Sequence, residues 1–186
     1  MNFQRWALVT GASSGLGVEY VRSLARSGHN IVLVARDGDR LRSVAGRVAE
    51  EFGVSVEVLV ADLHNPSDVA QVGDRLGDTR RPVRVLINNA GYGIAGNLAE
   101  SDLSAERNHL AIHVTTPLEL TKAVLPGMLE RGEGRIVFVS SVAGYLARGS
   151  YSAHKAWGLS MARSLNATYK AQGVHVSAVE PGFTRT

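Results

Sequence analysis

The sequence predicts an α/β protein with a doubly wound parallel sheet covered by helices on both faces. Short, continuous apolar runs alternate with longer stretches of helical periodicity along all 186 residues. Continuous apolar runs are typical of parallel strands that are buried on both faces. A glycine-rich turn joins the first apolar run to the first helical stretch. With right-handed crossovers, these observations predict a Rossmann-type three-layer fold with strand order 3-2-1-4-5-6.

The elements follow from the spacing of apolar residues. Strands are predicted at residues 6–9, 31–35, 54–61, 83–87, 136–139 and 174–179. Helices are predicted at residues 18–27, 41–52, 66–76, 98–131 and 151–172, the fourth broken near Asp102. Pro66 suits the first turn of the third helix, where its missing N–H costs nothing. Because no linker or low-complexity segment interrupts the alternation, residues 1–186 are expected to form one dinucleotide-binding and catalytic domain.

The composition narrows the class of protein. Apolar residues make up 45% and charged residues 20%, which are ordinary values for a globular domain. The net charge is +3 and the basic residues are scattered, so no nucleic-acid partner is expected. The chain has no cysteine, which excludes disulfides and thiolate chemistry, and no metal site is expected. Met1 to Val9 lacks a long apolar segment, so we expect neither a signal peptide nor a membrane anchor, and a cytoplasmic location.

The glycine-rich turn has the features of a phosphate-binding turn. Gly11 permits a tight turn, Gly15 lets the backbone approach a pyrophosphate, and Gly17 lets the helix pack close to the strand. The helix N-terminus offers free N–H groups and a positive dipole end, and Ser13 and Ser14 can add hydroxyl donors. The alternative is a glycine-rich connection that binds no ligand.

Together with further motifs, the turn resembles the short-chain dehydrogenase/reductase family. Thr10-Gly11-x-x-x-Gly15-x-Gly17, Asn88-Asn89-Ala90-Gly91, Ser140-Ser141, Tyr151-x-x-x-Lys155 and Pro181-Gly182 occur in the family's order at the expected strand ends. The resemblance implies an oxidoreductase that transfers a hydride between a nicotinamide cofactor and a small-molecule carbonyl or alcohol. The cofactor-binding residues that it implies are Thr10, Gly11, Ser13, Ser14, Gly15, Leu16, Gly17, Arg36, Asp62, Asn89, Ala90, Gly91, Tyr151, Lys155, Pro181, Gly182, Thr184 and Thr186.

The end of the second strand favours NADP(H) over NAD(H). NAD-preferring members of the family carry an acid where this chain has Ala35, and Arg36 follows. A guanidinium can pair with the 2′-phosphate and stack on adenine. Two alternatives remain: Asp37 could be the ribose-binding acid, and Arg36 could be a solvated surface residue. Asp62 resembles the family position that meets the adenine amino group, or it caps the third helix.

Tyr151 and Lys155 are the candidates for proton transfer. They lie four residues apart at the start of a helix and therefore share one face. A nearby ammonium group favours the phenolate, so Tyr151 could act as general acid in reduction and general base in oxidation. By the resemblance, Lys155 also holds the nicotinamide ribose and Ser141 hydrogen-bonds the substrate oxygen. The alternative for Ser140 and Ser141 is that both merely end the strand.

The chain departs from the family pattern in two places. His113 stands where the family usually has an asparagine that supports a water relay to the lysine. It could bond the same water through one ring nitrogen, or be a buried histidine satisfied by backbone. The loop from Ser141 to Tyr151 is a few residues shorter than usual, which should change the rim of the substrate pocket. His154 is interpreted as a helix-surface residue.

The C-terminal residues and the helices suggest two further expectations. In the family, the segment that here contains Pro181, Gly182, Thr184 and Thr186 meets the nicotinamide carboxamide, and a substrate-binding segment, a helix and a strand follow. The chain is therefore expected to be a fragment or to lack its tail, and a catalytically idle nucleotide-binding or interaction protein is the rival hypothesis. A homodimer or homotetramer is expected through the long helices. The first of these helices has more apolar surface than one sheet contact needs, from Val114, Leu118, Leu120, Ala123, Val124 and Leu125.

Overall fold

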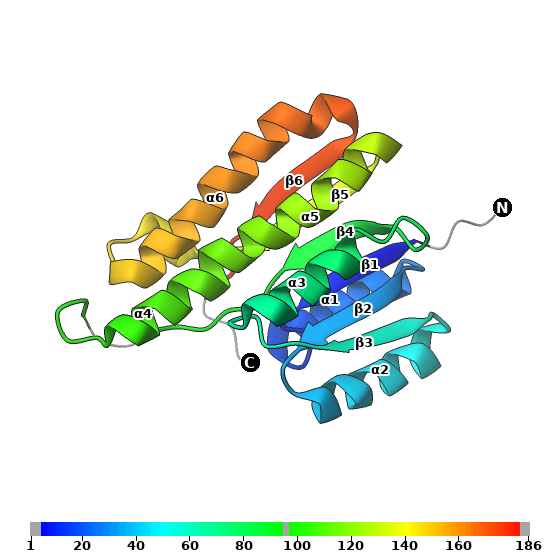
Figure 1. Ribbon diagram of the computed structural model, residues 1–186, viewed down its shortest axis with the longest axis horizontal. Coiled ribbons are helices and arrows are strands. Elements are labelled where there is room, and N and C mark those ends of the chain that lie inside the picture. The colour runs from blue at the N-terminus through cyan, green and yellow to red at the C-terminus, as the bar shows by residue number, and fades with distance from the viewer. Residues whose placement is uncertain (1–4, 95–96, 183–186) are drawn as a thin grey trace.

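The computed structural model describes residues 5–94 and 97–182, and in this part of the chain it has a six-stranded parallel sheet (Figure 1). The strands are β1 (Trp6–Thr10), β2 (Asn30–Ala35), β3 (Val56–Val60), β4 (Val83–Asn88), β5 (Gly134–Val139) and β6 (Val174–Val179). Their order is β3-β2-β1-β4-β5-β6, which confirms the predicted 3-2-1-4-5-6 topology. The order reverses between β1 and β4, the position at which doubly wound sheets bind ligands.

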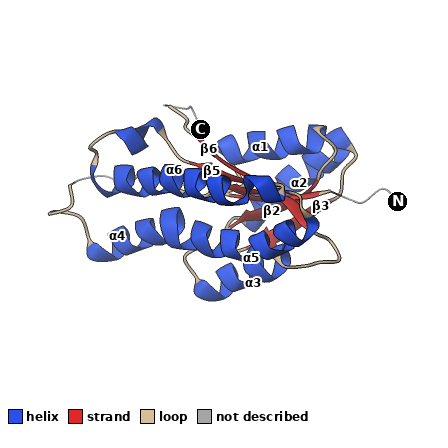
Figure 2. Cartoon of the chain, turned by 90° about the horizontal axis from the view of Figure 1, so that it is seen from above, coloured by secondary structure: helices blue, strands red, loops and turns tan. Residues whose placement is uncertain are grey.

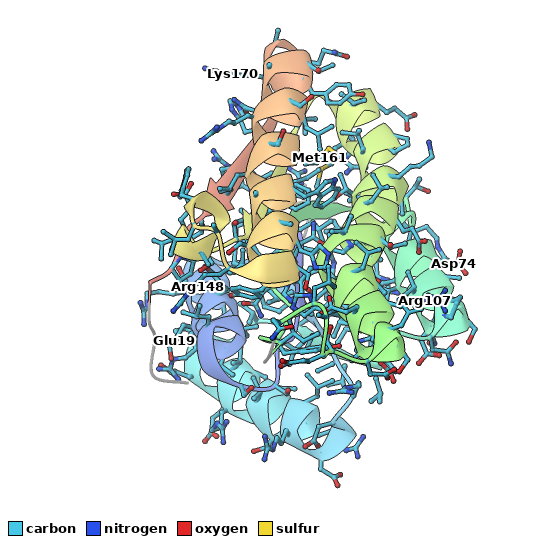
Figure 3. The ribbon with its side chains drawn as sticks, turned by 90° about the vertical axis from the view of Figure 1, so that its left-hand side faces the viewer. Glu19, Asp74, Arg107, Arg148, Met161 and Lys170 are labelled. Carbon is cyan, nitrogen blue, oxygen red and sulfur yellow. The ribbon has the colours of Figure 1, made fainter. Side chains whose placement is uncertain are left out.

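Helices cover both faces of the sheet and make the three predicted layers (Figure 2). On one face lie α1 (Gly15–Arg26) and α2 (Gly38–Phe52). On the other lie α3 (Pro66–Leu76), α5 (Thr116–Arg131) and α6 (Gly149–Tyr169), and α4 (Leu103–Leu110) precedes α5 and packs against α6. Figure 3 shows α5 and α6 side by side, with Met161 between them. No helix in the described ranges is long and apolar enough to cross a membrane.

Alternation along the central strands divides the core between the two faces. Leu8 and Val32 belong to the cluster beneath α3, α5 and α6, whereas Ala7 and Val9 belong to the cluster beneath α1 and α2. Successive strand side chains point to opposite faces, so a strand buried on both faces must be apolar throughout. All five residues of β1 are buried, which explains the unbroken apolar run in the sequence.

The long helical stretch differs from its prediction in two respects. The helix begins at Leu103 rather than at Leu98, so the predicted break near Asp102 is confirmed and the predicted start is wrong. Between α4 and α5 the backbone forms a π-helical turn at Ala111–Thr115. Such turns insert an extra residue into a helix and often occur at functional sites.

The apolar surface predicted for subunit contact is smaller than the sequence suggests. Leu120 and Val124 are each 1% exposed and pack into the core, so they do not contribute to the surface that could meet another subunit. Leu118 remains 43% exposed. Only the face of α5 that turns away from the sheet can meet another subunit, so the apolar residues on its sheet-facing side are not available for such a contact.

Candidate active site

A cleft of about 650 Å³ runs across the carboxyl ends of the strands and collects most of the predicted site residues. Those that line it are Gly11, Ser13, Ser14, Gly15, Leu16, Gly17, Arg36, Asp62, Asn89, Ala90, Gly91, His113, Ser141, Tyr151, Lys155, Pro181 and Gly182. Thr10 lies behind the cleft wall rather than on it. Thr184 and Thr186 lie outside the described residues.

The glycine turn is packed so closely that its backbone forms the floor of the cleft. Gly11 and Gly15 have φ values of +65° and +52°, which favour glycine. A Cβ atom at Gly17 would lie 2.0 Å from the carbonyl oxygen of Gly11. The turn thus leaves no room for a side chain at Gly17, which lets the start of α1 pack directly against the turn after β1.

Thr10 and Asn89 join the turn after β1 to the turn after β4. The Thr10 hydroxyl accepts hydrogen bonds from the backbone N–H groups of Asn89 and Ala90, both at 3.0 Å, and donates to the carbonyl of Ile87 at 3.3 Å. The Asn89 amide donates to the carbonyl oxygen of Thr10 at 2.8 Å. Both side chains therefore shape the cleft by holding its two central loops together.

Two exposed arginines line the end of the cleft next to β2. Arg36 follows the last residue of β2, and Arg40 lies one turn into α2. The carboxylate of Asp37 accepts from the backbone N–H of Arg40 at 3.0 Å and lies 3.2 Å from its guanidinium, so it caps α2. This engagement weighs against Asp37 as the ribose-binding acid. Arg40 was not predicted from the sequence, because Arg36 lies in the connection before α2 and no helical spacing relates the two.

Asp62 is held by the loop that follows β3. One of its carboxylate oxygens accepts from the backbone N–H of His64 at 3.1 Å and from His64 Nδ1 at 2.9 Å. These hydrogen bonds hold the pKa of Asp62 below its usual value. The predicted alternative, a cap for α3, is wrong, because Asn65 is the cap and accepts from the Ser67 N–H at 3.0 Å.

Tyr151 and Lys155 lie on the first turns of α6 and face the cleft. The Lys155 Nζ atom is 5.7 Å from the centroid of the Tyr151 ring and donates to the Val139 carbonyl at 2.8 Å. Lys155 is 8% exposed, and this burial lowers its pKa to about 8. The hydroxyl of Ser140 is buried and donates to the Lys155 carbonyl at 2.7 Å. Ser141 keeps a partly exposed side chain in the cleft, 3.1 Å from the Ala143 N–H that it accepts from.

His113 is buried beside this pair. Its Nε2 atom lies 2.8 Å from the Tyr92 carbonyl oxygen, and its ring approaches the Tyr151 ring edge-on at 5.9 Å between centroids. Burial and the charge of Lys155 lower its pKa to about 3, so the ring is neutral near pH 7. His113 and Lys155 also line a cavity of about 20 Å³, large enough for one water molecule. The contact with the Tyr92 backbone agrees with the alternative of a buried histidine that is hydrogen-bonded to backbone. The cavity leaves space for a water molecule between His113 and Lys155, as the other alternative requires.

Three aromatic side chains near the site were missed or misassigned. Tyr92 and His109 were not predicted from the sequence, and His154, interpreted as a helix-surface residue, is partly buried. His109 is fully buried, and its Nδ1 atom lies 2.8 Å from Nδ1 of His154. No sequence motif could have found this pair, because 45 residues separate its members.

Comparison with known proteins agrees with this arrangement. The chain matches the family of short chain dehydrogenases over residues 5–186. It is 34% identical to the very-long-chain 3-oxoacyl-CoA reductase of Anas platyrhynchos, with 97% of this chain and 60% of that protein aligned. It is 33% identical to the oxidoreductase UcpA of Escherichia coli strain K12, over 97% of this chain and 69% of that protein. The chain thus spans about 60% of the length of the first of these curated relatives.

Solved structures resemble the chain closely. The bulky-bulky ketone specific alcohol dehydrogenase from Comamonas testosteroni superimposes with a TM-score of 0.95 at 37% identity, covering 99% of this chain and 75% of that one. A short-chain dehydrogenase from Sphingobium yanoikuyae, solved in complex with NADPH, superimposes with a TM-score of 0.94 at 39% identity, covering 97% and 72%.

Proposed function

Since the chain belongs to the short-chain dehydrogenase family, we propose that it transfers a hydride between NADP(H) and a small-molecule carbonyl or alcohol, with Tyr151 as general acid and base. The observation that carries the proposal is the position of Tyr151 and Lys155, which lie one helical turn apart in the same cleft as the glycine turn. A nucleotide site and a proton-transfer pair that share one cleft indicate a redox reaction more than simple nucleotide binding.

The cleft fits a phosphorylated dinucleotide. At one end, the glycine turn and the N-terminus of α1 line the space, where backbone N–H groups at a helix N-terminus are suited to phosphate oxygens. At the β2 end, Arg36 and Arg40 provide two exposed cations suited to a 2′-phosphate. When bound, the nicotinamide supplies the hydride chemistry.

The chain's own residues supply the proton and the position of the substrate. In reduction, the Tyr151 hydroxyl gives its proton to the substrate oxygen, and in oxidation the phenolate takes it back. The Lys155 ammonium, held by the Val139 carbonyl, stabilises the phenolate. Ser141 hydrogen-bonds the substrate oxygen from the opposite side of the cleft, at the end of β5.

The test is consumption of NADPH with a panel of carbonyl compounds. We expect wild-type activity with at least one ketone and a fall of at least ~100-fold in Tyr151→Phe, because positioned proton transfer contributes roughly 10²–10⁴ in rate. The matched control is Tyr169→Phe at the far end of the same helix, which should keep full activity. NADPH binding without any turnover would support the rival, a catalytically idle nucleotide-binding protein.

A further inference from the structure

His109 connects the loop that follows β4 with the helix that carries Tyr151 and Lys155. Its imidazole is fully buried, on the last turn of α4. Its Nε2 atom lies 3.0 Å from the carbonyl oxygen of Tyr92, and its Nδ1 atom lies 2.8 Å from Nδ1 of His154 on α6. The His109 ring therefore joins three segments of the chain: the loop after β4, α4 and α6. It does so where α4 and α6 run side by side (Figure 3).

These contacts define where the protons lie. A carbonyl oxygen can only accept, so His109 Nε2 must carry a proton and donate it to Tyr92. In a neutral ring the other nitrogen is then a lone pair, so His109 Nδ1 accepts and His154 Nδ1 donates. His113 Nε2 lies 2.8 Å from the same carbonyl oxygen and 3.3 Å from the Tyr92 backbone N–H, so these contacts do not define its tautomer.

The same contacts lie next to the reacting groups. Tyr92 directly follows Asn89-Ala90-Gly91, which lines the cleft. His154 directly precedes Lys155 and is three residues from Tyr151. The His109 ring is 5.8 Å from the Tyr151 ring and 4.4 Å from the His113 ring, between centroids. A shift of His109 would therefore move both the loop and α6, and displacements of about 1 Å can cost a reaction much of its rate.

We propose that His109 is a positioning residue whose hydrogen bonds to Tyr92 and His154 hold the cofactor loop and the catalytic helix in register. The inference rests on the proposed function for its effect on catalysis, whereas the hydrogen bonds themselves can be tested without it. It is distinct from the role of His113, whose hydrogen-bond contacts among the described residues reach Tyr92 in the loop and not α6.

The link requires neutral histidines. A proton on His109 Nδ1 would place two N–H groups against each other at 2.8 Å and break the bond to His154. The groups that face the pair are Glu106 on α4, Lys155 on α6, His113 in the π-helical turn, and Tyr92. Burial lowers the pKa of both His109 and His154 and outweighs the attraction of the Glu106 carboxylate. The hydrogen-bonded form is therefore the one present at neutral pH.

The chain allows the two bonds to be removed separately. His109→Gln keeps a donor at the Nε2 position and loses the acceptor for His154, whereas His109→Asn keeps that acceptor and loses the donor to Tyr92. His154→Leu removes the donor, and His154→Asn restores one at the Nδ1 position.

Single-turnover hydride transfer and NADPH affinity provide the readouts. We expect His154→Leu and His109→Gln each to lower the transfer rate about fivefold, since one hydrogen bond is lost, and His154→Asn to stay within about twofold of wild type. The double variant His109→Gln/His154→Leu should be no slower than either single variant, because both break the same bond. His109→Asn should instead weaken NADPH binding about fivefold. A role in stability alone would lower the melting temperature of all variants and leave rates and affinities unchanged, which would overturn the proposal.

Histidine tautomers measured by ¹⁵N NMR separate this proposal from the proposed function. We expect His109 protonated at Nε2 and His154 at Nδ1 in the unloaded protein. If these tautomers are found but no carbonyl is reduced, the link exists and the assigned reaction fails. A His109 ring protonated at Nδ1 at neutral pH would overturn the link whatever the activity.

Discussion

The ammonium group of Lys155 donates a 2.8 Å hydrogen bond to the carbonyl oxygen of Val139, which ties the start of α6 to the end of β5. The Lys155 side chain is buried, and this burial lowers its pKa to about 8. Its charge is therefore present below about pH 8 and lost above it. Since a lysine in the unfolded chain keeps its proton up to its ordinary pKa of 10.5, unfolding becomes less favourable as pH rises from about 8 to 10.5.

Titration of Lys155 should appear in cofactor binding. We expect the NADPH dissociation constant of the wild type to rise between pH 7 and pH 9, as the positive charge beside the nicotinamide end is lost. In Lys155→Met the dissociation constant should already be high at pH 7 and change little with pH. Lys122→Met, on the exposed side of α5, is the control and should follow the wild type. A pH-independent wild type would contradict the role of the charge.

Arg36 should determine the preference between the two nicotinamide cofactors. We expect Arg36→Ala to weaken NADPH binding by about 10-fold or more and to leave NADH nearly unchanged, since hydrogen bonds to charged groups contribute roughly 1.5–3 kcal/mol. Arg47→Ala removes the same charge from the exposed face of α2 and should affect neither cofactor. Fluorescence titration of both cofactors into both variants measures this. Equal wild-type affinities would rule out the assignment to NADP(H).

Gly17→Ala should destroy the phosphate-binding turn. The new methyl group would lie 2.0 Å from the Gly11 carbonyl oxygen, so the turn must move. We expect loss of NADPH binding and a lower melting temperature. Gly46→Ala is the control, because nothing lies within 4 Å of its added methyl group, and alanine in a helix should stabilise α2 by roughly 0.5–1 kcal/mol. NADPH affinity retained in Gly17→Ala would show that the turn does not hold the cofactor.

His113 should make the protein sensitive to acid. Its pKa of about 3 in the folded chain lies below the unfolded value of 6.5, so the unfolded chain binds the extra proton between these values. Stability should therefore fall as pH drops below about 6.5, by roughly 3 kcal/mol at pH 4 from this group alone. Urea unfolding of His113→Asn, which cannot titrate, should show a smaller fall over the same range. Identical slopes in the two proteins would assign the acid sensitivity to other groups.

The outer face of the α4–α5 helix should mediate self-association. Leu110 and Leu118 are each 43% exposed and lie eight residues apart, about two turns. We expect the protein to sediment as a dimer or tetramer at micromolar concentration and Leu118→Glu to shift it toward monomer. Lys122→Glu, a charge reversal on an exposed position of the same helix, should have less effect. A monomeric wild type would refute the expectation.

The fold was accessible from the sequence because its signals are local. Each strand contains a short, largely apolar run, and the turn at Gly11–Gly17 is specified by residues that are adjacent in the chain. The π-helical turn at Ala111–Thr115 was not predicted, since it depends on how the helix packs rather than on its own sequence.

The site could be predicted from the sequence only in part, because only some of its residues belong to local motifs. The motif residues Ser141, Tyr151 and Lys155 were found because their spacing is characteristic, and the structure brings all three to one cleft. The pairing of His109 with His154 was missed because helical periodicity gives the face of each residue but not which helix will lie opposite. Only the assembled α4–α6 contact reveals it.

The bridge from Thr10 to Asn89 and Ala90 has a consequence for synthesis of the chain on the ribosome. The hydroxyl that organises the loop after β1 has its partners almost eighty residues later, at separations of 79 and 80. A nascent chain that ends before β4 cannot complete this bridge, and its first strand lacks one of its two neighbours. Contacts between distant segments form late in folding, after the cost of loop closure has been met. The nucleotide cleft should therefore arise as a single late event rather than as an early N-terminal module.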